Sequence, residues 1–129
     1  GVAARGENGF AVFNGPDEQF ISGRVMGADG GIGGTYAAMP ELLLKADELV
    51  RANKMEQARE VQYAINTIIY ALCGCKGNMY GVIKEVLRRR EGLDIGGVRA
   101  PLANLVPEDM PKIEAVCKLI DETIAAYCG

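Results

Sequence analysis

The sequence predicts an α/β fold that is mostly helical and contains two short parallel strands. Two observations predict the strands: the apolar run Phe10–Phe13 ends at an Asn-Gly-Pro turn, and the glycine-rich segment Ala28–Thr35 follows a short helical stretch. A third observation predicts the helices, because apolar residues recur at helical spacing through most of residues 40–128. Since a short helix connects the two strands, they should pair in parallel.

The first strand–helix unit follows from local residue preferences. All four residues of Phe10–Phe13 are apolar, which predicts a strand buried on both faces. Pro16 suits the first turn of a helix, where its missing N–H costs nothing. Asp17 and Glu18 place negative charge where a helix N-terminus favours it. The helix should end near Met26, before Gly27, with Phe20, Ile21 and Val25 facing inward.

A second short strand is expected within Ala28–Thr35, where the glycines allow another part of the structure to approach the backbone closely. Helices are then predicted over about Pro40–Ala52 and Lys54–Cys73, the latter capped by Asn53. The remaining elements are a helix over Asn78–Arg90 stopped by Gly92, an extended segment over Asp94–Leu102, and a last helix from near Pro107 with Ile113, Val116, Ile120 and Ile124 on its core face.

Two strands are too few for a complete parallel sheet. Parallel sheets are nearly always covered on both faces and have more strands than this. We therefore expect the rest of the sheet to come from a preceding segment of the same protein or from a separate chain. Residues Gly1–Glu7 would then be the tail of a preceding helix.

Composition and charge exclude several classes of function. The chain has a net charge of −3 and no histidine, which removes Ser-His-Asp and Cys-His mechanisms from these residues. The densest basic run, Arg88–Arg90, lies on a predicted helix and is typical of a solvated face, so no nucleic-acid binding is expected. No apolar stretch approaches the ~20 residues of a membrane span, and no signal-peptide pattern is present. We therefore expect a cytoplasmic protein with no membrane partner.

The four cysteines do not form a metal-binding pattern. Their spacing lacks two closely spaced pairs, and no histidine can complete a tetrahedral zinc site. We expect free thiols in a reducing compartment, and neither a metal nor an organic cofactor. The cysteines are Cys73, Cys75, Cys117 and Cys128.

Polar and glycine-rich motifs follow both predicted strands. The motif FNGPDE spans Phe13–Glu18, and GGIGGTY spans Gly30–Tyr36. Active sites of parallel β/α barrels are built at the carboxyl ends of the strands, so both motifs should face one pocket. Together they resemble the seventh and eighth strands of the N-acetylneuraminate lyase and dihydrodipicolinate synthase family. The resemblance continues through Val82–Leu87, Gly92 and Val98–Leu102, which are similar to the family's C-terminal helical extension.

The resemblance implies a fold and a mechanism. The family fold is a (β/α)8 TIM barrel of about 250 residues. Residues 1–52 would form its last strand–helix units, and residues 53–129 the C-terminal helical extension. The family consists of class I aldolases, in which a lysine on the sixth strand forms a Schiff base with a keto acid. That lysine would precede this chain, which then holds no catalytic residue of its own. The six lysines present are expected at the surface: Lys45, Lys54, Lys76, Lys84, Lys112 and Lys118.

The resemblance leaves substrate recognition to this chain. In the lyase branch, the positions that match Gly15, Asp17 and Glu18 contact the hydroxylated tail of the sugar acid, and Gly33 and Gly34 bring backbone against the substrate. Carboxylates suit a polyol because they accept hydrogen bonds from several hydroxyls. Two alternatives stay open from the residues themselves. Asp17 and Glu18 can be ordinary helix-start residues, and the glycines can simply permit tight turns.

Three positions depart from the pattern of the lyase branch. Gly34 stands where many bacterial lyases carry a substrate-contacting serine, Pro16 where an aromatic residue is common, and Ala37 where asparagine often follows the tyrosine. Tyr36 can line the pocket or pack in the core, and Arg99 is expected to be structural or to contact another subunit.

The favoured function is cleavage of N-acetylneuraminate to N-acetylmannosamine and pyruvate by a complete barrel, with a small sugar acid as substrate. Family members are commonly tetramers, so a homo-oligomer is expected. The alternatives are another 2-keto acid aldolase or a dihydrodipicolinate synthase-like enzyme, and a non-catalytic barrel fragment.

Overall fold

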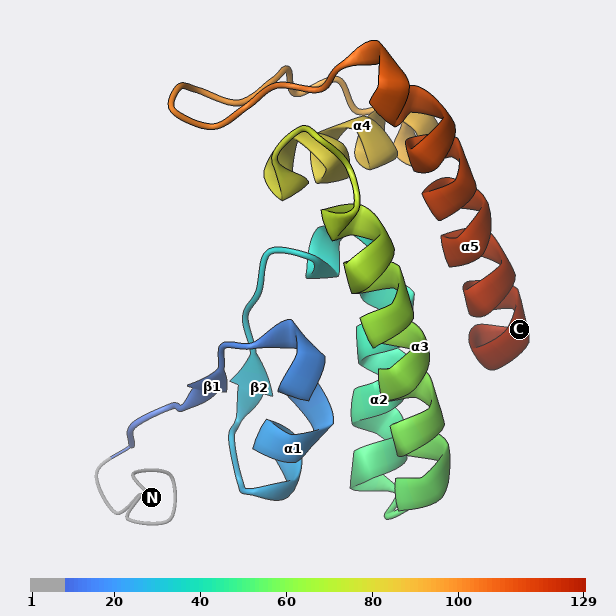
Figure 1. Cartoon of the computed structure of the whole chain (residues 1–129). Helices are drawn as coiled ribbons and strands as arrows, with labels where there is room; N and C mark the ends of the chain where they lie inside the picture. Colours follow the sequence, from blue (N-terminus) through green and yellow to red (C-terminus); the bar gives the residue numbers. More distant parts are fainter. Residues whose placement is uncertain (1–8) are drawn as a thin grey trace.

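A computed structural model describes residues 9–129, in which a small sheet lies beside a group of helices (Figure 1). Strands β1 (Phe13–Asn14) and β2 (Gly30–Gly31) pair in parallel, with Phe13 opposite Gly30 and Asn14 opposite Gly31. Parallel pairing and a mostly helical chain are therefore as the sequence predicts. The expected tail of a helix over residues 1–7 lies outside the described residues.

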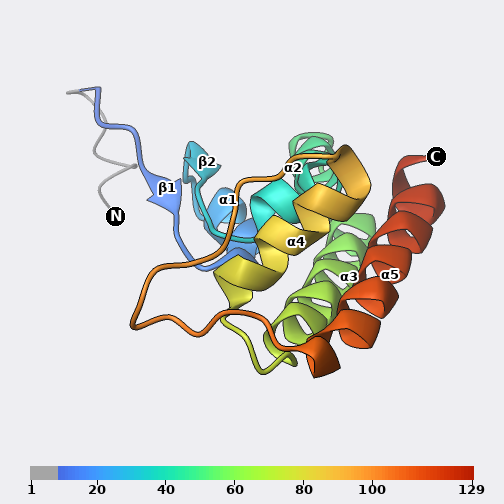
Figure 2. The ribbon, with the colours of Figure 1, turned by 90° about the horizontal axis from the view of Figure 1, so that it is seen from above.

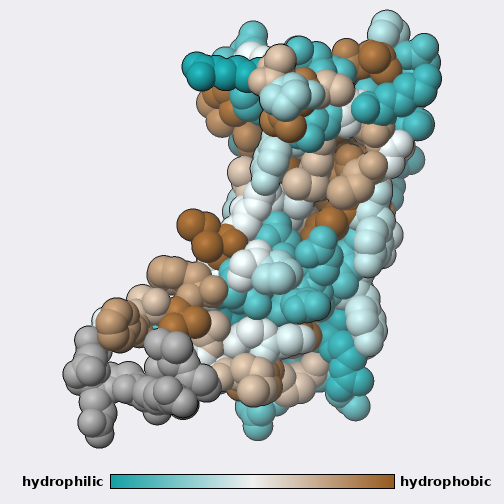
Figure 3. All heavy atoms as spheres, turned by 60° about the vertical axis from the view of Figure 1, so that its left-hand side comes forward, coloured by the Kyte–Doolittle hydropathy of each residue, from teal (hydrophilic) through white to brown (hydrophobic). Residues whose placement is uncertain are grey.

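The first strand differs from its prediction. A strand over Phe10–Phe13 buried on both faces was expected, but β1 begins only at Phe13. Phe10 and Phe13 are 69% and 57% exposed. The helices lie on one side of the sheet, and apolar side chains are visible on the opposite side, next to the grey residues (Figures 2 and 3). Within residues 9–129 β1 has one neighbouring strand, so its other edge and one face have nothing to pack against.

A 3-10 turn, η2 (Asp17–Gln19), leads into helix α1 (Phe20–Val25), which ends before Gly27 at φ 96°. Phe20 is buried as predicted, but Val25 is not, because 56% of it is exposed. Helices α2 (Pro40–Arg51) and α3 (Met55–Cys73) cover the side of α1 that carries Phe20. Val25 instead lines a shallow surface hollow of about 380 Å³ with Ile21, Met26 and the start of α3.

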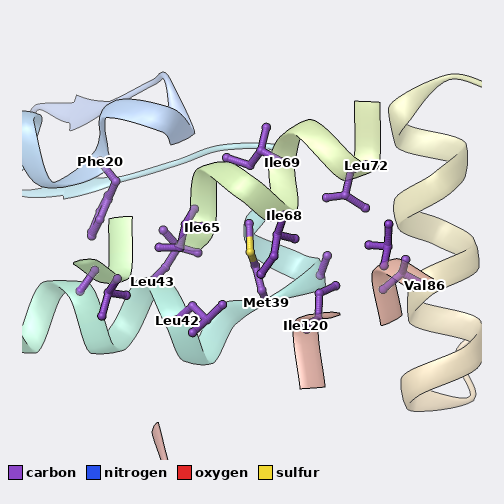
Figure 4. Packing of buried hydrophobic residues seen from close by; sticks show 14 of the residues in the cluster. Phe20, Met39, Leu42, Leu43, Ile65, Ile68, Ile69, Leu72, Val86 and Ile120 are labelled. Atoms are coloured by element: carbon purple, nitrogen blue, oxygen red, sulfur yellow. The ribbon is translucent and has the colours of Figure 1, made fainter. Parts of the chain in front are cut away.

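The core lies where helices α2 (Pro40–Arg51), α3 (Met55–Cys73) and α5 (Met110–Cys128) pack side by side (Figure 4). Each helix presents one apolar stripe, which is the pattern that predicts these helices from sequence. The buried side chains of the three stripes are Leu42, Leu43, Ala46, Leu49, Ala58, Val61, Ile65, Ile68, Ile69, Leu72, Ile113, Val116 and Ile120.

The connection between α2 and α3 corrects one prediction. Asn53 was expected to cap α3, but it adopts the left-handed conformation at φ 58° and ends α2 instead. Its N–H donates to the Val50 carbonyl at 3.0 Å, and the Lys54 N–H donates to the Leu49 carbonyl at 2.9 Å. These two bonds form a Schellman motif, in which asparagine is one of the few residues that tolerates the left-handed position.

Helix α4 (Met79–Glu91) starts at Asn78, whose side chain accepts from the Tyr80 N–H, and stops at Gly92 in the left-handed region. The basic run at its end is only partly a solvated face. Arg88 is exposed and pairs with Glu85, whereas Arg90 donates to the Ala38 carbonyl at 3.0 Å and pairs with Asp121 of α5. Arg90 therefore links three segments.

A 3-10 turn, η3 (Tyr36–Ala38), precedes α2, and another, η4 (Pro107–Asp109), precedes α5. Asp109 has no exposed surface. Its carboxylate accepts from the backbone N–H groups of Lys76 at 2.7 Å, Gly77 at 2.9 Å and Val106 at 3.2 Å. This one side chain thus joins the loop before α4 to the start of α5. Between residues 9 and 129, none of the helices is both long and apolar enough to cross a membrane.

Candidate functional site

The two predicted motifs meet at the carboxyl ends of the strands. Asp17 lies three residues after β1, and Thr35 lies four residues after β2. The Asp17 Oδ2 atom accepts a hydrogen bond from the Thr35 N–H at 2.9 Å and a second one from the Thr35 hydroxyl. Because the strands are parallel, the loops that follow them lie at the same end of the sheet, and residues 18 apart in sequence come into contact.

Asp17 is 8% exposed, although aspartate is rarely buried without partners. Its two carboxylate oxygens differ. Oδ2 is occupied by Thr35, whereas Oδ1 accepts no hydrogen bond from residues 9–129 and lies against the backbone of Gly33. One oxygen is therefore anchored, and the other keeps its capacity to accept.

Gly33 is required by this arrangement. A Cβ atom at this position would lie 1.6 Å from Asp17 Oδ1 and 2.4 Å from its Cγ. The Asp17 carboxylate could not keep its present position beside such an atom. The glycine-rich motif was expected to allow a close approach to its backbone, and at Gly33 the approaching group is the Asp17 carboxylate of the other motif. Sequence reasoning did not single out Thr35, the partner of Asp17, because a hydroxyl residue that follows two glycines gives no distinct signal of its own.

Glu18 is exposed, and its carboxylate makes no hydrogen bond or ion pair with the part of the chain that the structure describes. Gly15 is also exposed, and a Cβ atom there would meet nothing within 4 Å. These two residues face open space beside the anchored Asp17. The structure thus brings Asp17 and Gly33 together, and leaves Glu18 and Gly15 accessible.

Gly34 approaches a residue that the motifs did not indicate. A Cβ atom at Gly34 would lie 2.8 Å from the Cε1 atom of Tyr80, at the start of α4. The Tyr80 ring therefore covers the backbone of Gly34 while 51% of the residue remains exposed. Sequence spacing carries no signal for this contact, because α4 is separated from the strands by two helices.

Tyr36 is half-buried and packs against the edge of the core. Its ring meets that of Phe20 edge to face, with the centroids 5.9 Å apart and an interplanar angle of 83°. Its hydroxyl is buried and has no hydrogen-bond partner within residues 9–129. Burial raises the pKa of Tyr36 to about 12, and the nearby Asp17 charge adds to the rise. Of the two roles left open for Tyr36, core packing is the one that the geometry supports.

Helix α3 contacts the site through the side chain of Gln62. Gln62 is 4% exposed and contacts both the Asp17 carbonyl and the Ile21 N–H. Sequence reasoning missed Gln62, although a signal was present. It is a polar residue between Val61 and Ile65 on the apolar stripe of α3, where a polar side chain needs buried partners.

The other candidate groups do not converge on this site. None of the six lysines is buried, as predicted. Arg99 is exposed in the segment between α4 and η4, and its side chain makes no hydrogen bond or ion pair with residues 9–129. The four cysteines are free thiols, and the described residues contain no group of three or more metal-ligating side chains.

Comparison with known proteins places this chain in a family. The profile of the dihydrodipicolinate synthetase family matches residues 2–120. An N-acetylneuraminate lyase from Mediterraneibacter gnavus is 58% identical over 111 residues, which are 86% of this chain and 35% of that protein. An N-acetylneuraminate lyase from Fusobacterium nucleatum is 32% identical over 94 residues, 73% of this chain and 31% of that protein.

The fold is shared with solved aldolases. The wild-type sialic acid aldolase of Ruminococcus gnavus matches with a TM-score of 0.89 and 54% identity, over 92% of this chain and 39% of that chain. The F. nucleatum N-acetylneuraminate lyase matches with a TM-score of 0.69 and 28% identity, over 91% and 37% of the two chains. The present chain thus spans about a third of the length of the curated relatives it matches. With the family profile covering nearly all of its residues, the chain belongs to the dihydrodipicolinate synthetase family.

Proposed function

We propose that this chain is the C-terminal part of a class I aldolase that cleaves N-acetylneuraminate to N-acetylmannosamine and pyruvate. Within that enzyme it supplies recognition of the sugar tail, through Gly15, Asp17, Glu18, Gly33 and Gly34. The support is the similarity to N-acetylneuraminate lyases together with the arrangement of acidic side chains at the strand ends.

The observation that carries the proposal is that two neighbouring carboxylates differ: Asp17 is anchored by hydrogen bonds, and Glu18 is exposed. Asp17 is buried and fixed to Thr35, while its Oδ1 atom and the whole Glu18 carboxylate remain available as acceptors. The hydroxyls of a polyol are donors that such oxygens bind well. Because Asp17 is already held in place, the substrate loses less free energy in ordering the site.

The catalytic step would come from the rest of the barrel. None of the six lysines lies at the end of β1 or β2, so none is placed to form a Schiff base at this site. Residues 1–52 would supply the last strand–helix units of the (β/α)8 barrel, and residues 53–129 the helical extension that covers them. The preceding strands would pack on the edge and face of β1 that residues 9–129 leave uncovered.

One observation favours a substrate other than N-acetylneuraminate itself, such as a different 2-keto sugar acid. Many bacterial lyases are expected to carry a serine at the position of Gly34, but a side chain here would collide with Tyr80. The substrate contact that a serine provides would then be absent, or replaced by the Tyr80 hydroxyl. A panel of 2-keto acids separates the two activities by their kcat/KM ratio.

The first experiment is the intact mass of the purified protein, followed by borohydride trapping with pyruvate. A longer polypeptide or a companion chain should become covalently labelled by pyruvate at a lysine outside residues 1–129. The 13.8-kDa chain alone should not be labelled. Labelling of any of its six lysines would contradict the proposed division of labour.

The second experiment tests recognition. Glu18→Gln in the pyruvate-trapping protein should raise KM for N-acetylneuraminate by about tenfold, because a hydrogen bond to a charged acceptor contributes about 1.5 to 3 kcal/mol. Trapping by pyruvate alone, which has no sugar tail, should be unchanged. Glu114→Gln, an exposed glutamate on α5, is the matched control. Equal KM values for the two variants would remove Glu18 from the site.

We also propose that the complete enzyme is a homotetramer, as family members commonly are, and that it lies in the cytoplasm. Light scattering of the purified protein measures the first, and fractionation of the source cells the second.

A further inference from the structure

A buried amide on helix α3 holds residues 17–21, which carry Asp17 and Glu18 and are called the site segment below. The Gln62 side chain is 4% exposed, and its Oε1 atom accepts from the Ile21 N–H at 3.0 Å. Its Nε2 atom donates to the Asp17 carbonyl at 3.1 Å and to Asn66 Oδ1 at 2.9 Å. The amide therefore uses both of its donors and its acceptor, and two of these three bonds go to the site segment.

Asn66 extends the same contact by one helical turn. Its Nδ2 atom donates to the Glu18 carbonyl at 3.3 Å. Gln62 and Asn66 are four residues apart, so they lie on one face of α3 and hydrogen-bond to each other as well. Consecutive carbonyls of the site segment, those of Asp17 and Glu18, are thus held by one helix that lies 41 or more residues away in sequence.

The helical turns of the site segment, η2 and the start of α1, have no side-chain cap of their own. The first N–H groups of a helix have no partner within the helix, and a short helix such as α1 depends on outside groups to satisfy them. Gln62 supplies that partner to Ile21 in the first turn of α1.

We propose that Gln62, assisted by Asn66, is a positioning residue that sets where Asp17 and Glu18 stand at the strand ends. The proposal rests on the function proposed above. Asp17 is then held from two sides, by Thr35 at its carboxylate and by Gln62 at its carbonyl. Glu18, which has no side-chain partner within residues 9–129, takes its position from the backbone that Gln62 and Asn66 hold.

The first test measures the contact without any activity. Hydrogen exchange of the Ile21 amide is compared in the wild-type chain, Gln62→Leu and Gln57→Leu, the last being an exposed glutamine on the same helix. Gln62→Leu should speed exchange of Ile21 by about tenfold, while Gln57→Leu should not change it. Unchanged exchange in Gln62→Leu would overturn the proposal, because the segment would then not depend on this amide.

The second test asks whether the contact acts through Glu18. In the pyruvate-trapping protein, Gln62→Leu should raise KM for the sugar acid by about fivefold and leave pyruvate trapping unchanged. In a Glu18→Gln background the same substitution should raise KM by a smaller factor than in the wild type, because one of the two carboxylates that Gln62 positions has already lost its charge. Additive effects, or a fall in thermal stability with no change in KM, would reduce Gln62 to a structural role and overturn the proposal.

A third variant covers the case in which Gln62→Leu does not fold. Gln62→Glu has the same size and keeps the acceptor for Ile21, but it loses both donors and sets a charge against the Asp17 carbonyl. It should raise KM while preserving Ile21 protection, and an unchanged KM would contradict the positioning role. If the wild-type protein traps no pyruvate and cleaves no sugar acid, the proposed function fails. The exchange of Ile21 then decides by itself whether Gln62 holds the segment.

Discussion

Substituting Gly33 by alanine tests the central contact of the site most directly. The added Cβ atom would stand 1.6 Å from Asp17 Oδ1, so the carboxylate must leave its place or the loop after β2 must shift. Either movement breaks at least one of the two hydrogen bonds between Asp17 and Thr35. A hydrogen bond to a charged group contributes about 1.5 to 3 kcal/mol, and we expect Gly33→Ala to lower stability by at least this amount.

The assay is thermal unfolding of the chain followed by circular dichroism. For a domain of this size, each kcal/mol shifts Tm by about 4 °C, so Gly33→Ala should melt about 6 to 12 °C below the wild type. Gly15→Ala is the matched control, because its Cβ would meet nothing within 4 Å and its φ is not in the left-handed region. Its Tm should stay within about 2 °C of the wild type. Equal Tm values for the two variants would refute the reasoning that Asp17 and Thr35 join the two loops.

Two further predictions concern buried polar groups. Burial raises the pKa of Asp109, but three backbone N–H donors and the nearby Lys112 charge together outweigh this effect and lower the pKa below its ordinary value. Its contribution to stability is therefore fully present above pH ~4 and is lost as pH falls toward the lowered pKa. Asp109→Asn should lower Tm at pH 7 and approach the wild type in acid, with exposed Glu108→Gln as control; a constant difference across this pH range would contradict the charge-based reason. Tyr36→Phe removes a buried hydroxyl that has no partner in residues 9–129, so stability should be unchanged or raised by up to about 1 kcal/mol, and a fall larger than that of exposed Tyr63→Phe would reveal a missed hydrogen bond.

The helices beyond the first unit were predictable because each carries its own signal. The apolar stripe of α3 repeats over five turns, and α4 is bounded by a side-chain cap at Asn78 and a left-handed glycine at Gly92. These features depend on neighbouring residues alone. Asn53 was assigned to the wrong helix because its side chain suits both a helix start and the left-handed position after a helix end, and only the tight connection between α2 and α3 distinguishes them.

The strands show the opposite situation. An apolar run predicts burial, but burial needs neighbours, and β1 finds a single neighbouring strand within the described residues. Phe10 and Phe13 are therefore exposed although their sequence is that of a central strand. Val25 follows the same rule, since helical spacing says which residues share a face but not which faces another element covers.

The sequence by itself determined the helices, the parallel strand order and the family, because these depend on short-range preferences and on two motifs at the strand ends. Only the tertiary structure decided how the site is held. It placed the Asp17 carboxylate against Gly33 and Thr35, Tyr80 over Gly34, and Gln62 beneath the site segment. These contacts join residues 16 to 46 positions apart. No local preference specifies such pairs, because they form only when the helices have packed and buried the polar groups that need partners.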